Sequence, residues 1–413
     1  MNRALIIQLT RFGDLVQTKR LVLTLQNRNF EVHICVDRSL KDLATILYPQ
    51  ANIHAVVAHG TGIKGRGFDS ALPVNLSVFT TFKNLAFSEV YNLNFSPMNY
   101  AVASLFDPDT VKGHRMVNGQ PMKSPWFDLA FRLAAERRNN INLVDYWAAL
   151  SPEMIPAEKV NPLADPKGGG IGVVLAGRET RRSLPYEVFA PLILAARSVN
   201  KCKKIFLLGS NAEREAGRKL QAKFPASVSA DTTNLAGRTD WQGLVGVVSG
   251  LDMVMTPDTG TMHLAAHLGV PVLGFFLSSA WCTETGPYGT GHTIIQADTD
   301  CSPCVESQPC YCNLKCLAPF KEPGAARFIA TRKPEHLVSG LSVFESACDF
   351  LGTKFIIKAG NDVTGERRER IRQFIGSHLG ILDIGRHGPF PDLAEKFYRE
   401  KDWITLNRGV ILP

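Results

Sequence analysis

The chain has 413 residues, of which 45% are hydrophobic and 20% charged, a composition typical of a folded globular protein. Lysine and arginine number 46 against 38 aspartate and glutamate residues, and the net charge of +8 suits a nucleotide diphosphate or an acceptor on an anionic membrane surface. The charge also fits nucleic acid, but the sequence has no motif of a nucleic-acid-binding module, so we expect no nucleic-acid partner.

The apolar segments are too short for export or for membrane insertion. The run Ala4–Ile7 is shorter than the core of a signal peptide. The longest apolar stretch, Leu268–Leu277, contains Pro271 and has about half the length of a membrane span. We therefore expect a cytoplasmic protein that at most rests on the inner face of a membrane.

In the first part of the chain, short apolar strands alternate with amphipathic helices. The predicted strands cover residues 4–9, 31–36, 53–58 and 90–94, the predicted helices cover 15–27 and 40–47, and a glycine-rich flexible loop is predicted at 60–67. This alternation predicts a parallel sheet with helices on both faces. Residues 96–150 are less regular and support no detailed prediction.

Two prolines and three glycines between residues 161 and 170 indicate an interdomain linker, after which the same alternation restarts. Strands are predicted at 171–175, 204–208, 253–256 and 270–276, and helices at 185–199, 212–224, 241–249 and 260–268. We predict an α/β fold of two facing, doubly wound domains, 1–165 and 166–345, with a cleft between the carboxyl ends of their sheets. Residues 346–413, with a basic helix at 366–380, are predicted to form a C-terminal extension.

A short loop follows the first predicted strand and opens the first helix: Thr10-Arg11-Phe12-Gly13-Asp14. Gly13 would permit a sharp turn, and the helix dipole would favour an ionised carboxylate at Asp14. Such a carboxylate at the mouth of a cleft suits a general base for an alcohol. The alternative is that Asp14 only caps the helix.

A second loop, Asp258-Thr259-Gly260-Thr261, joins a predicted strand directly to a helix. The exposed backbone N–H groups of Thr259, Gly260 and Thr261 would attract a phosphate. Asp258 would repel phosphate, so its partners should be sugar hydroxyls or a cation. His263 and His267 lie four residues apart on this helix, but Leu264 stands where a zinc protease has its glutamate, which disfavours a metal site there.

A third loop carries Arg178, Arg181 and Arg182 between a strand and a helix that opens near Pro185. These arginines would neutralise a diphosphate at the rim of the cleft. The alternative is a solvated run of charge.

The three loops, in this order and spacing, closely resemble those of the bacterial heptosyltransferases, glycosyltransferase family nine. The resemblance covers roughly residues 1–345, and Asp258-Thr259-Gly260 with His263 is its most specific part. It is supported by Leu207-Leu208-Gly209, Leu235-Ala236-Gly237, Val270-Pro271-Val272 and Gly286-Pro287-Tyr288-Gly289. The resemblance implies a GT-B fold and an inverting transfer of heptose, or a related sugar, from an ADP-sugar to an acceptor hydroxyl.

The same resemblance implies roles for individual residues. Asp14 would be the general base, and Arg182 would lie near the diphosphate, where the family usually has lysine. Thr259, Gly260 and Thr261 would hold the diphosphate, with Asp258 and His263 near the donor sugar. Arg178 would also face the donor, and Glu213 and Thr239 would lie near the nucleoside. The acceptor would be a lipopolysaccharide core precursor or, alternatively, an autotransporter-type protein.

Five of the nine cysteines fall between residues 301 and 316. In a reducing compartment such a cluster suggests a metal site, and some relatives of the family that glycosylate autotransporters carry cysteine-bound iron here. The spacing does not separate zinc from iron. The predicted ligands of this structural site are Cys301, Cys304, Cys310 and Cys316, with Cys312 as the spare; the alternative is a surface loop of reduced thiols.

The transfer itself needs no metal in this interpretation, because arginines and a helix end neutralise the diphosphate. The two Asp-x-Asp sequences, at Asp107 and Asp298, follow no strand predicted at a nucleotide cleft. Two rival interpretations remain. A nucleotide-sugar 2-epimerase needs several acid–base side chains, whereas these loops supply one clear carboxylate base. A catalytically silent scaffold built around the cysteines would not need Asp14, the arginines and Asp258 together.

Overall fold

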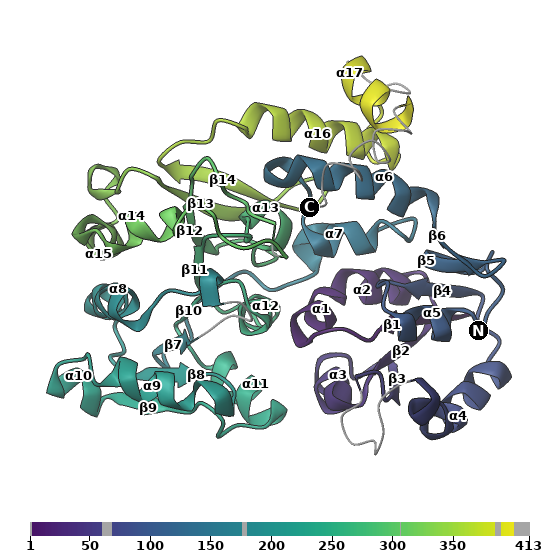
Figure 1. The fold of residues 1–413 in the computed structure, drawn as a ribbon, viewed down its shortest axis with the longest axis horizontal. Helices are drawn as coiled ribbons and strands as arrows, with labels where there is room; N and C mark the ends of the chain where they lie inside the picture. Colours follow the sequence, from purple (N-terminus) through teal and green to yellow (C-terminus); the bar gives the residue numbers. More distant parts are fainter. Residues whose placement is uncertain (1, 60–67, 176–179, 306, 385–389, 400–413) are drawn as a thin grey trace. The chain divides into compact units, whose positions relative to one another are not determined.

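The computed structural model describes residues 2–59, 68–175, 180–305, 307–384 and 390–399, which form two compact units (Figure 1). Unit 1 comprises Met1–Glu136, Val144–Ile155 and Glu369–Pro413, and unit 2 comprises Arg137–Leu143 and Pro156–Arg368. The chain thus changes unit after residues 136, 143, 155 and 368. The domain boundaries predicted at 165 and 345 stay predictions, and the predicted loop at 60–67 lies outside the described residues.

Unit 1 is built on a six-stranded sheet in the order β3-β2-β1-β4-β5-β6. The strands are β1 (Arg3–Gln8), β2 (Glu31–Asp37), β3 (Asn52–Val56), β4 (Glu89–Asn92), β5 (Val111–Val117) and β6 (Gln120–Lys123). Strands β1 to β5 pair in parallel, and β6 pairs antiparallel with β5. Strand β1 is buried from Ala4 to Gln8 because it lies inside the sheet, with a strand paired on each side.

The helices of unit 1 follow the strands as the alternating pattern predicts. They are α1 (Phe12–Gln17), α2 (Lys19–Asn27), α3 (Lys41–Leu47), α4 (Phe68–Asn84), α5 (Pro97–Ala103), α6 (Pro125–Leu133) and α7 (Leu143–Ala148), with α17 (Pro391–Ala394) contributed by the C-terminal segment. The helix predicted at 15–27 is interrupted at Thr18. The Thr18 hydroxyl donates to the Asp14 carbonyl oxygen over 2.9 Å, and such back-bonding bends helices.

Unit 2 contains an eight-stranded sheet in the order β14-β13-β12-β11-β10-β7-β8-β9. The strands are β7 (Ile171–Val174), β8 (Ile205–Leu208), β9 (Thr232–Asn234), β10 (Met253–Thr256), β11 (Val272–Phe276), β12 (Thr293–Ala297), β13 (Leu341–Cys348) and β14 (Thr353–Ala359). Strands β7 to β12 are parallel, and β13 and β14 add an antiparallel edge. Strand β14 therefore places the start of the predicted C-terminal extension in this sheet.

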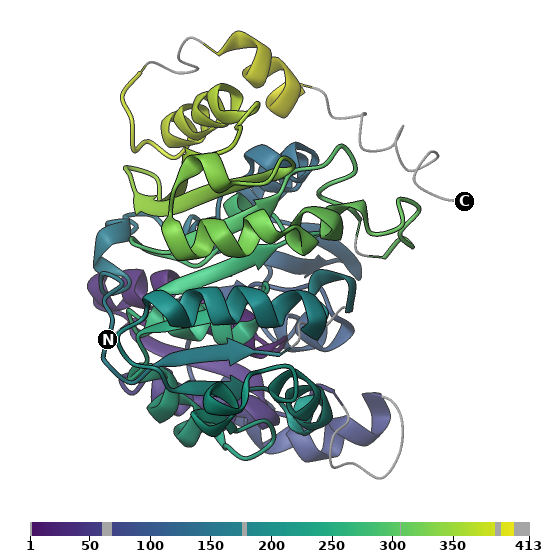
Figure 2. The same cartoon turned by 90° about the vertical axis from the view of Figure 1, so that its left-hand side faces the viewer.

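The main helices of unit 2 are α8 (Tyr186–Val199), α9 (Arg214–Gln221), α10 (Ala226–Ala230), α11 (Trp241–Ser249), α12 (Gly260–His267), α13 (Cys282–Thr285), α14 (Ala318–Lys321) and α15 (Pro323–Thr331); α16 (Gly365–His378) crosses the boundary between the units. Helices α8 and α15 lie side by side in front of the strands (Figure 2). The rings of Phe189 in α8 and Phe275 in β11 meet edge to face, with centroids 5.3 Å apart, within the apolar core of this unit.

Among the described residues, no helix is long and apolar enough to cross a membrane.

Candidate active site

The predicted donor residues of unit 2 come together because they follow neighbouring parallel strands. Strands β9, β8, β7, β10 and β11 are adjacent in that order, so their carboxyl ends meet at one edge of the sheet. Arg182 follows β7, Glu213 follows β8, Thr239 follows β9 and Asp258 follows β10. This edge is where an open α/β sheet binds its ligand.

Helix α12 begins directly after Asp258 and Thr259, as predicted. Thr259 has an extended backbone and caps the helix, since its hydroxyl oxygen accepts a hydrogen bond from the Met262 N–H at 3.3 Å. The Thr259 hydroxyl also lies 2.9 Å from that of Thr256 in β10, which fixes the cap to the strand. The first-turn N–H groups of Gly260 and Thr261 have no partner within the helix and suit an anion.

The Asp258 carboxylate is the centre of a buried polar cluster. Arg182 donates to Asp258 Oδ2 and forms an ion pair with it. The Thr285 hydroxyl donates to the same oxygen over 2.8 Å, and His263 Nε2 lies 3.8 Å from Asp258 Oδ1. Because Asp258 would repel phosphate, the sequence predicted sugar hydroxyls or a cation beside it. That cation is Arg182, which the sequence analysis had assigned only to the diphosphate.

Arg181 and Arg182, in the loop after β7, have different partners. Arg181 donates to the backbone carbonyl oxygens of Gln308, over 2.5 Å, and Val305, over 3.1 Å, in the cysteine-rich loop. Its neighbour Arg182 binds Asp258 instead. Arg178, the third predicted arginine, lies outside the described residues. Arg181 thus contacts the cysteine-rich loop, and the expectation of three arginines on one diphosphate stays a prediction.

The loops predicted near the nucleoside lie against each other. The Gly237 N–H donates to the Gly209 carbonyl oxygen over 2.9 Å, which joins the ends of β9 and β8. Gly237 has a φ of +66°, and a Cβ there would come within 2.6 Å of Asn211 Cα, so this approach requires glycine. Glu213 accepts from the Ser210 N–H at 2.7 Å and thereby caps the turn after β8. Glu213 and Thr239 are both half-buried on this pair of loops.

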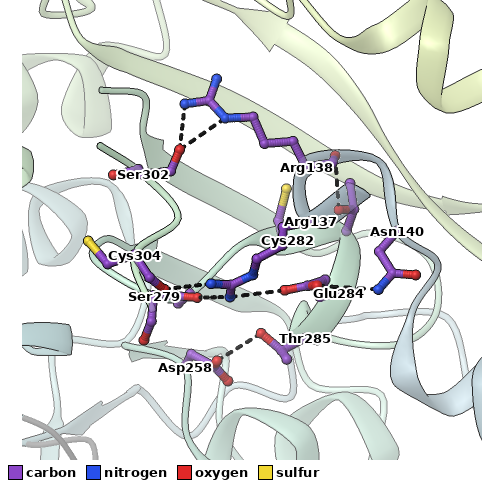
Figure 3. Close-up of polar contacts among 12 residues, drawn as sticks. Arg137, Arg138, Asn140, Asp258, Ser279, Cys282, Glu284, Thr285, Ser302 and Cys304 are labelled. Carbon is purple, nitrogen blue, oxygen red and sulfur yellow. Dashed lines mark hydrogen bonds and ion pairs between the residues drawn. The ribbon is translucent and has the colours of Figure 1, made fainter. Parts of the chain in front are cut away.

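The loop after β11 adds residues that the sequence analysis missed (Figure 3). Glu284 in α13 accepts from Arg137 Nη2 and from Asn140 Nδ2, each over 3.3 Å. Burial raises the pKa of the Glu284 carboxyl, and the nearby Asp258 charge raises it further. Its place after a strand at the ligand edge is a signal that could have identified Glu284, whereas Arg137 is 147 residues away in sequence and carries no such signal.

Asp14 lies in unit 1, in the first turn of α1. Its backbone carbonyl accepts from Thr18 Oγ1 over 2.9 Å and from Gln8 Nε2 over 3.4 Å. Its carboxylate Oδ2 accepts from the Arg11 N–H at 3.3 Å, so Asp14 caps α1 from inside the helix while Arg11 occupies the cap position. Gly13 lies within α1, so the sharp turn predicted there is absent. The half-buried carboxylate stays a candidate base.

The cysteine-rich loop brings several thiols near each other. Burial raises the pKa of Cys316, and the charges of Cys304, Cys301 and Cys310 raise it further. Within the described part of the loop, which omits residue 306, no three Cys, His, Asp or Glu side chains are arranged to hold a metal ion. The predicted zinc or iron site therefore stays a prediction.

The two Asp-x-Asp sequences have other partners. Asp107 accepts from the Asp109 N–H at 3.0 Å in a turn, as predicted. Asp298 pairs with Arg138 at 3.0 Å, and the exposed Asp300 pairs with Lys315 at 3.3 Å. Both Asp-x-Asp sequences thus have partners within the protein, one of them distant in sequence.

Several solved structures have a similar fold. They include a glycosyl transferase family 9 protein from Veillonella parvula (TM-score 0.56, 13% identity, 71% of this chain and 86% of that chain). They also include the E. coli heptosyltransferase WaaC with ADP (TM-score 0.54, 17% identity, 71% and 93%). The fold is that of the GT-B glycosyltransferases, as the sequence predicted.

The sequence of part of the second unit, with the segment directly before it, matches a family model. Residues 148–315 match the model of glycosyltransferase family 9 (heptosyltransferase). This match confirms the predicted resemblance to family 9 over these residues. Similar curated proteins are the lipopolysaccharide core heptosyltransferase OpsX of Haemophilus influenzae (33% identity, 22% of this chain) and lipopolysaccharide heptosyltransferase 2 of Salmonella typhimurium (31%, 20%). The matches span about a quarter of those proteins, 25% and 24%.

Proposed function

We propose that the protein transfers heptose, or a related sugar, from an ADP-sugar to an acceptor hydroxyl with inversion at the anomeric carbon. The observation that carries the proposal is the capped start of α12 beside the Asp258–Arg182 pair. Two backbone N–H groups suited to phosphate stand there next to a carboxylate suited to sugar hydroxyls. The family 9 match across residues 148–315 supports the same reaction class.

In the proposed reaction, the acceptor hydroxyl loses its proton to the Asp14 carboxylate, and the acceptor oxygen attacks the anomeric carbon. The bond between that carbon and the phosphate oxygen breaks, and ADP leaves with the electron pair. The N–H groups of Thr259, Gly260 and Thr261 stabilise the charge that develops on the diphosphate, with Arg182 and Arg178 as the nearby cations. Glu213 and Thr239 hold the nucleoside, and Asp258 and His263 lie near the sugar.

The acceptor in this proposal is a lipopolysaccharide core precursor, and the protein acts in the cytoplasm on the inner membrane surface. The similar curated proteins are heptosyltransferases of lipopolysaccharide, and a net charge of +8 suits an anionic surface. A protein acceptor of the autotransporter type is the second candidate. The cysteines Cys301, Cys304, Cys310 and Cys316 would bind a structural zinc or iron ion with no part in the transfer.

The test is turnover of ADP-heptose, measured as ADP release with a lipopolysaccharide core acceptor, in the wild type and in Asp14→Asn. A general base contributes about 10²–10⁴-fold, so we expect a loss of this size. Asp42→Asn is the matched control, because Asp42 also lies in the first turn of a helix of unit 1 and is exposed. That control should change the rate by less than about twofold.

Other outcomes separate the alternatives. Equal rates for wild type and Asp14→Asn would remove Asp14 as the base. The absence of nucleotide release with any ADP- or UDP-sugar would favour the scaffold. Full turnover in the presence of a chelator is expected for a metal-independent transfer, and the anomeric configuration of the product, read by NMR, tests inversion.

A further inference from the structure

The loop after β11 and helix α13 stand beside the predicted donor loop without a role in the proposed chemistry. Strands β10 and β11 are parallel neighbours, so Ser279 and Glu284 emerge at the same sheet edge as Asp258. The Thr285 hydroxyl joins the two loops directly through its 2.8 Å hydrogen bond to Asp258. The Asp258 charge also contributes to the raised pKa of the Glu284 carboxyl.

Glu284 is held in position by the segment 137–140, which is distant in sequence. Arg137 Nη2 donates both to Glu284 Oε2, over 3.3 Å, and to the Ser279 carbonyl oxygen, over 2.9 Å. Asn140 donates to the other carboxyl oxygen of Glu284 over 3.3 Å. Each carboxyl oxygen can accept more than one hydrogen bond, so two donors leave acceptor capacity for a ligand. The Glu284 side chain is 18% exposed, which leaves it accessible to one.

Ser279 provides independent evidence that the cluster of Ser279, Glu284 and Asp258 lacks a ligand. The residue is 7% exposed, and within the described part of the chain its buried hydroxyl has no hydrogen-bond partner. Ser278, which directly precedes it, has a φ of +62°, a left-handed conformation uncommon for a residue with a side chain. A buried hydroxyl that lacks a partner is destabilising unless a bound molecule supplies the hydrogen bond.

We propose that Ser279 and Glu284 form a subsite that binds hydroxyl groups of the donor sugar beside Asp258. The chemistry favours the sugar over the nucleotide, because two carboxylates repel phosphate while accepting hydrogen bonds from hydroxyls. This inference rests on the proposed function and names the residues that distinguish a sugar-bearing nucleotide from the nucleotide alone. Arg137, which donates both to Glu284 and to the Ser279 carbonyl oxygen, is the positioning residue.

The experiment compares binding of ADP with binding of ADP-heptose by calorimetry, using the full-length protein. Glu284→Gln and Ser279→Ala should each leave ADP affinity within about twofold and weaken ADP-heptose by about tenfold. Ser279→Ala should also leave the thermal midpoint unchanged or raise it, because it removes a buried hydroxyl that has no partner in the unliganded protein. A merely structural serine would not combine these two results.

Asn140→Ala is the matched control, because it breaks the contact to Glu284 from the other side and leaves the carboxylate in place. It should keep the ratio of ADP-heptose to ADP affinity within about twofold of wild type. If it reproduces the sugar-specific loss of Glu284→Gln, Glu284 only anchors the 137–140 segment and the inference is overturned. A wild type that binds ADP-heptose, with both substitutions silent, overturns the inference alone. A wild type that binds no ADP-sugar overturns the proposed function as well.

Discussion

Arg182 forms an ion pair with Asp258 across a separation of 76 residues, and this contact ties the loop after β7 to the loop after β10. The two side chains are 12% and 6% exposed. A carboxylate buried to this degree requires a partner, because an isolated charge is poorly solvated in the interior. The pair also fixes the position of Asp258 at the start of α12, so the ion pair links the stability of unit 2 to its ligand edge.

Arg182→Met should reduce both stability and donor binding. Removing one partner of a buried pair costs about 3–5 kcal/mol in the free energy of unfolding, measured by urea titration. ADP affinity, measured by calorimetry, should fall by about tenfold or more if Arg182 also faces the diphosphate. In the double variant with Asp258→Asn, the two stability losses should be less than additive. A loss of stability with unchanged ADP affinity would confine Arg182 to a structural role.

In unit 1, Arg20→Met should cause one of the largest losses of stability. Arg20 Nη1 lies 2.5 Å from Asp145 Oδ1 with both side chains almost fully buried, and Arg20 also donates to the Ile155 carbonyl oxygen over 2.9 and 3.1 Å. We expect a loss of about 3–5 kcal/mol in the free energy of unfolding.

The matched control is Arg3→Met, because the Arg3–Glu31 pair is about one-third exposed. Exposed pairs contribute about 0–1 kcal/mol, so this variant should change little. Equal effects of the two substitutions in urea unfolding would contradict the role assigned to the buried pair.

Acid should destabilise unit 2 through His292. Burial lowers the pKa of His292 to about 4 in the folded protein, below its unfolded value of 6.5. The unfolded state therefore binds more protons than the folded state between about pH 4 and pH 6.5. The contribution of neutral His292 to stability is complete above about pH 6.5 and is lost as the pH falls towards 4.

For one proton, the slope reaches about 1.4 kcal/mol per pH unit. His292→Gln should reduce the pH dependence of the unfolding free energy of unit 2 by up to that slope. The free energy is measured by urea unfolding at about pH 5 and about pH 7. Identical pH dependence in wild type and variant would show that His292 does not take up the proton on unfolding.

The metal prediction can be tested by alkylation of the cysteines. If Cys301, Cys304, Cys310 and Cys316 bind a metal, iodoacetamide followed by peptide mass spectrometry should modify these four only after a chelator is added. Cys312 is exposed and should react in both conditions, whereas Cys282 is buried, and burial raises its pKa to about 12, so it should react in neither. Equal modification of the four before and after chelation would contradict a bound metal.

Much of the fold was predictable because the alternation of buried strands and helices is local. The helix 241–249 and the strand 253–256 have the predicted bounds, since apolar periodicity and the Asp240 cap define them without help from distant residues. The helix predicted at 15–27 was interrupted for a local reason, the back-bonding of Thr18 to Asp14, which propensity does not register. The antiparallel strand β14 was missed because pairing across a sheet edge leaves a weak signal in one segment.

By itself the sequence determined which loops carry the candidate chemistry. A capped helix start after a strand, as at Thr259 and Gly260, depends only on neighbouring residues, and the family 9 match confirmed the resemblance that these loops indicated. Only the tertiary structure decided the partners of those residues. Arg182 binds Asp258 while Arg181 turns to the cysteine-rich loop, and Arg137 reaches Glu284 across 147 residues. The physical reason is that ion pairs and hydrogen bonds depend on distance in space, which residue type and spacing do not specify when the chain between the partners folds back.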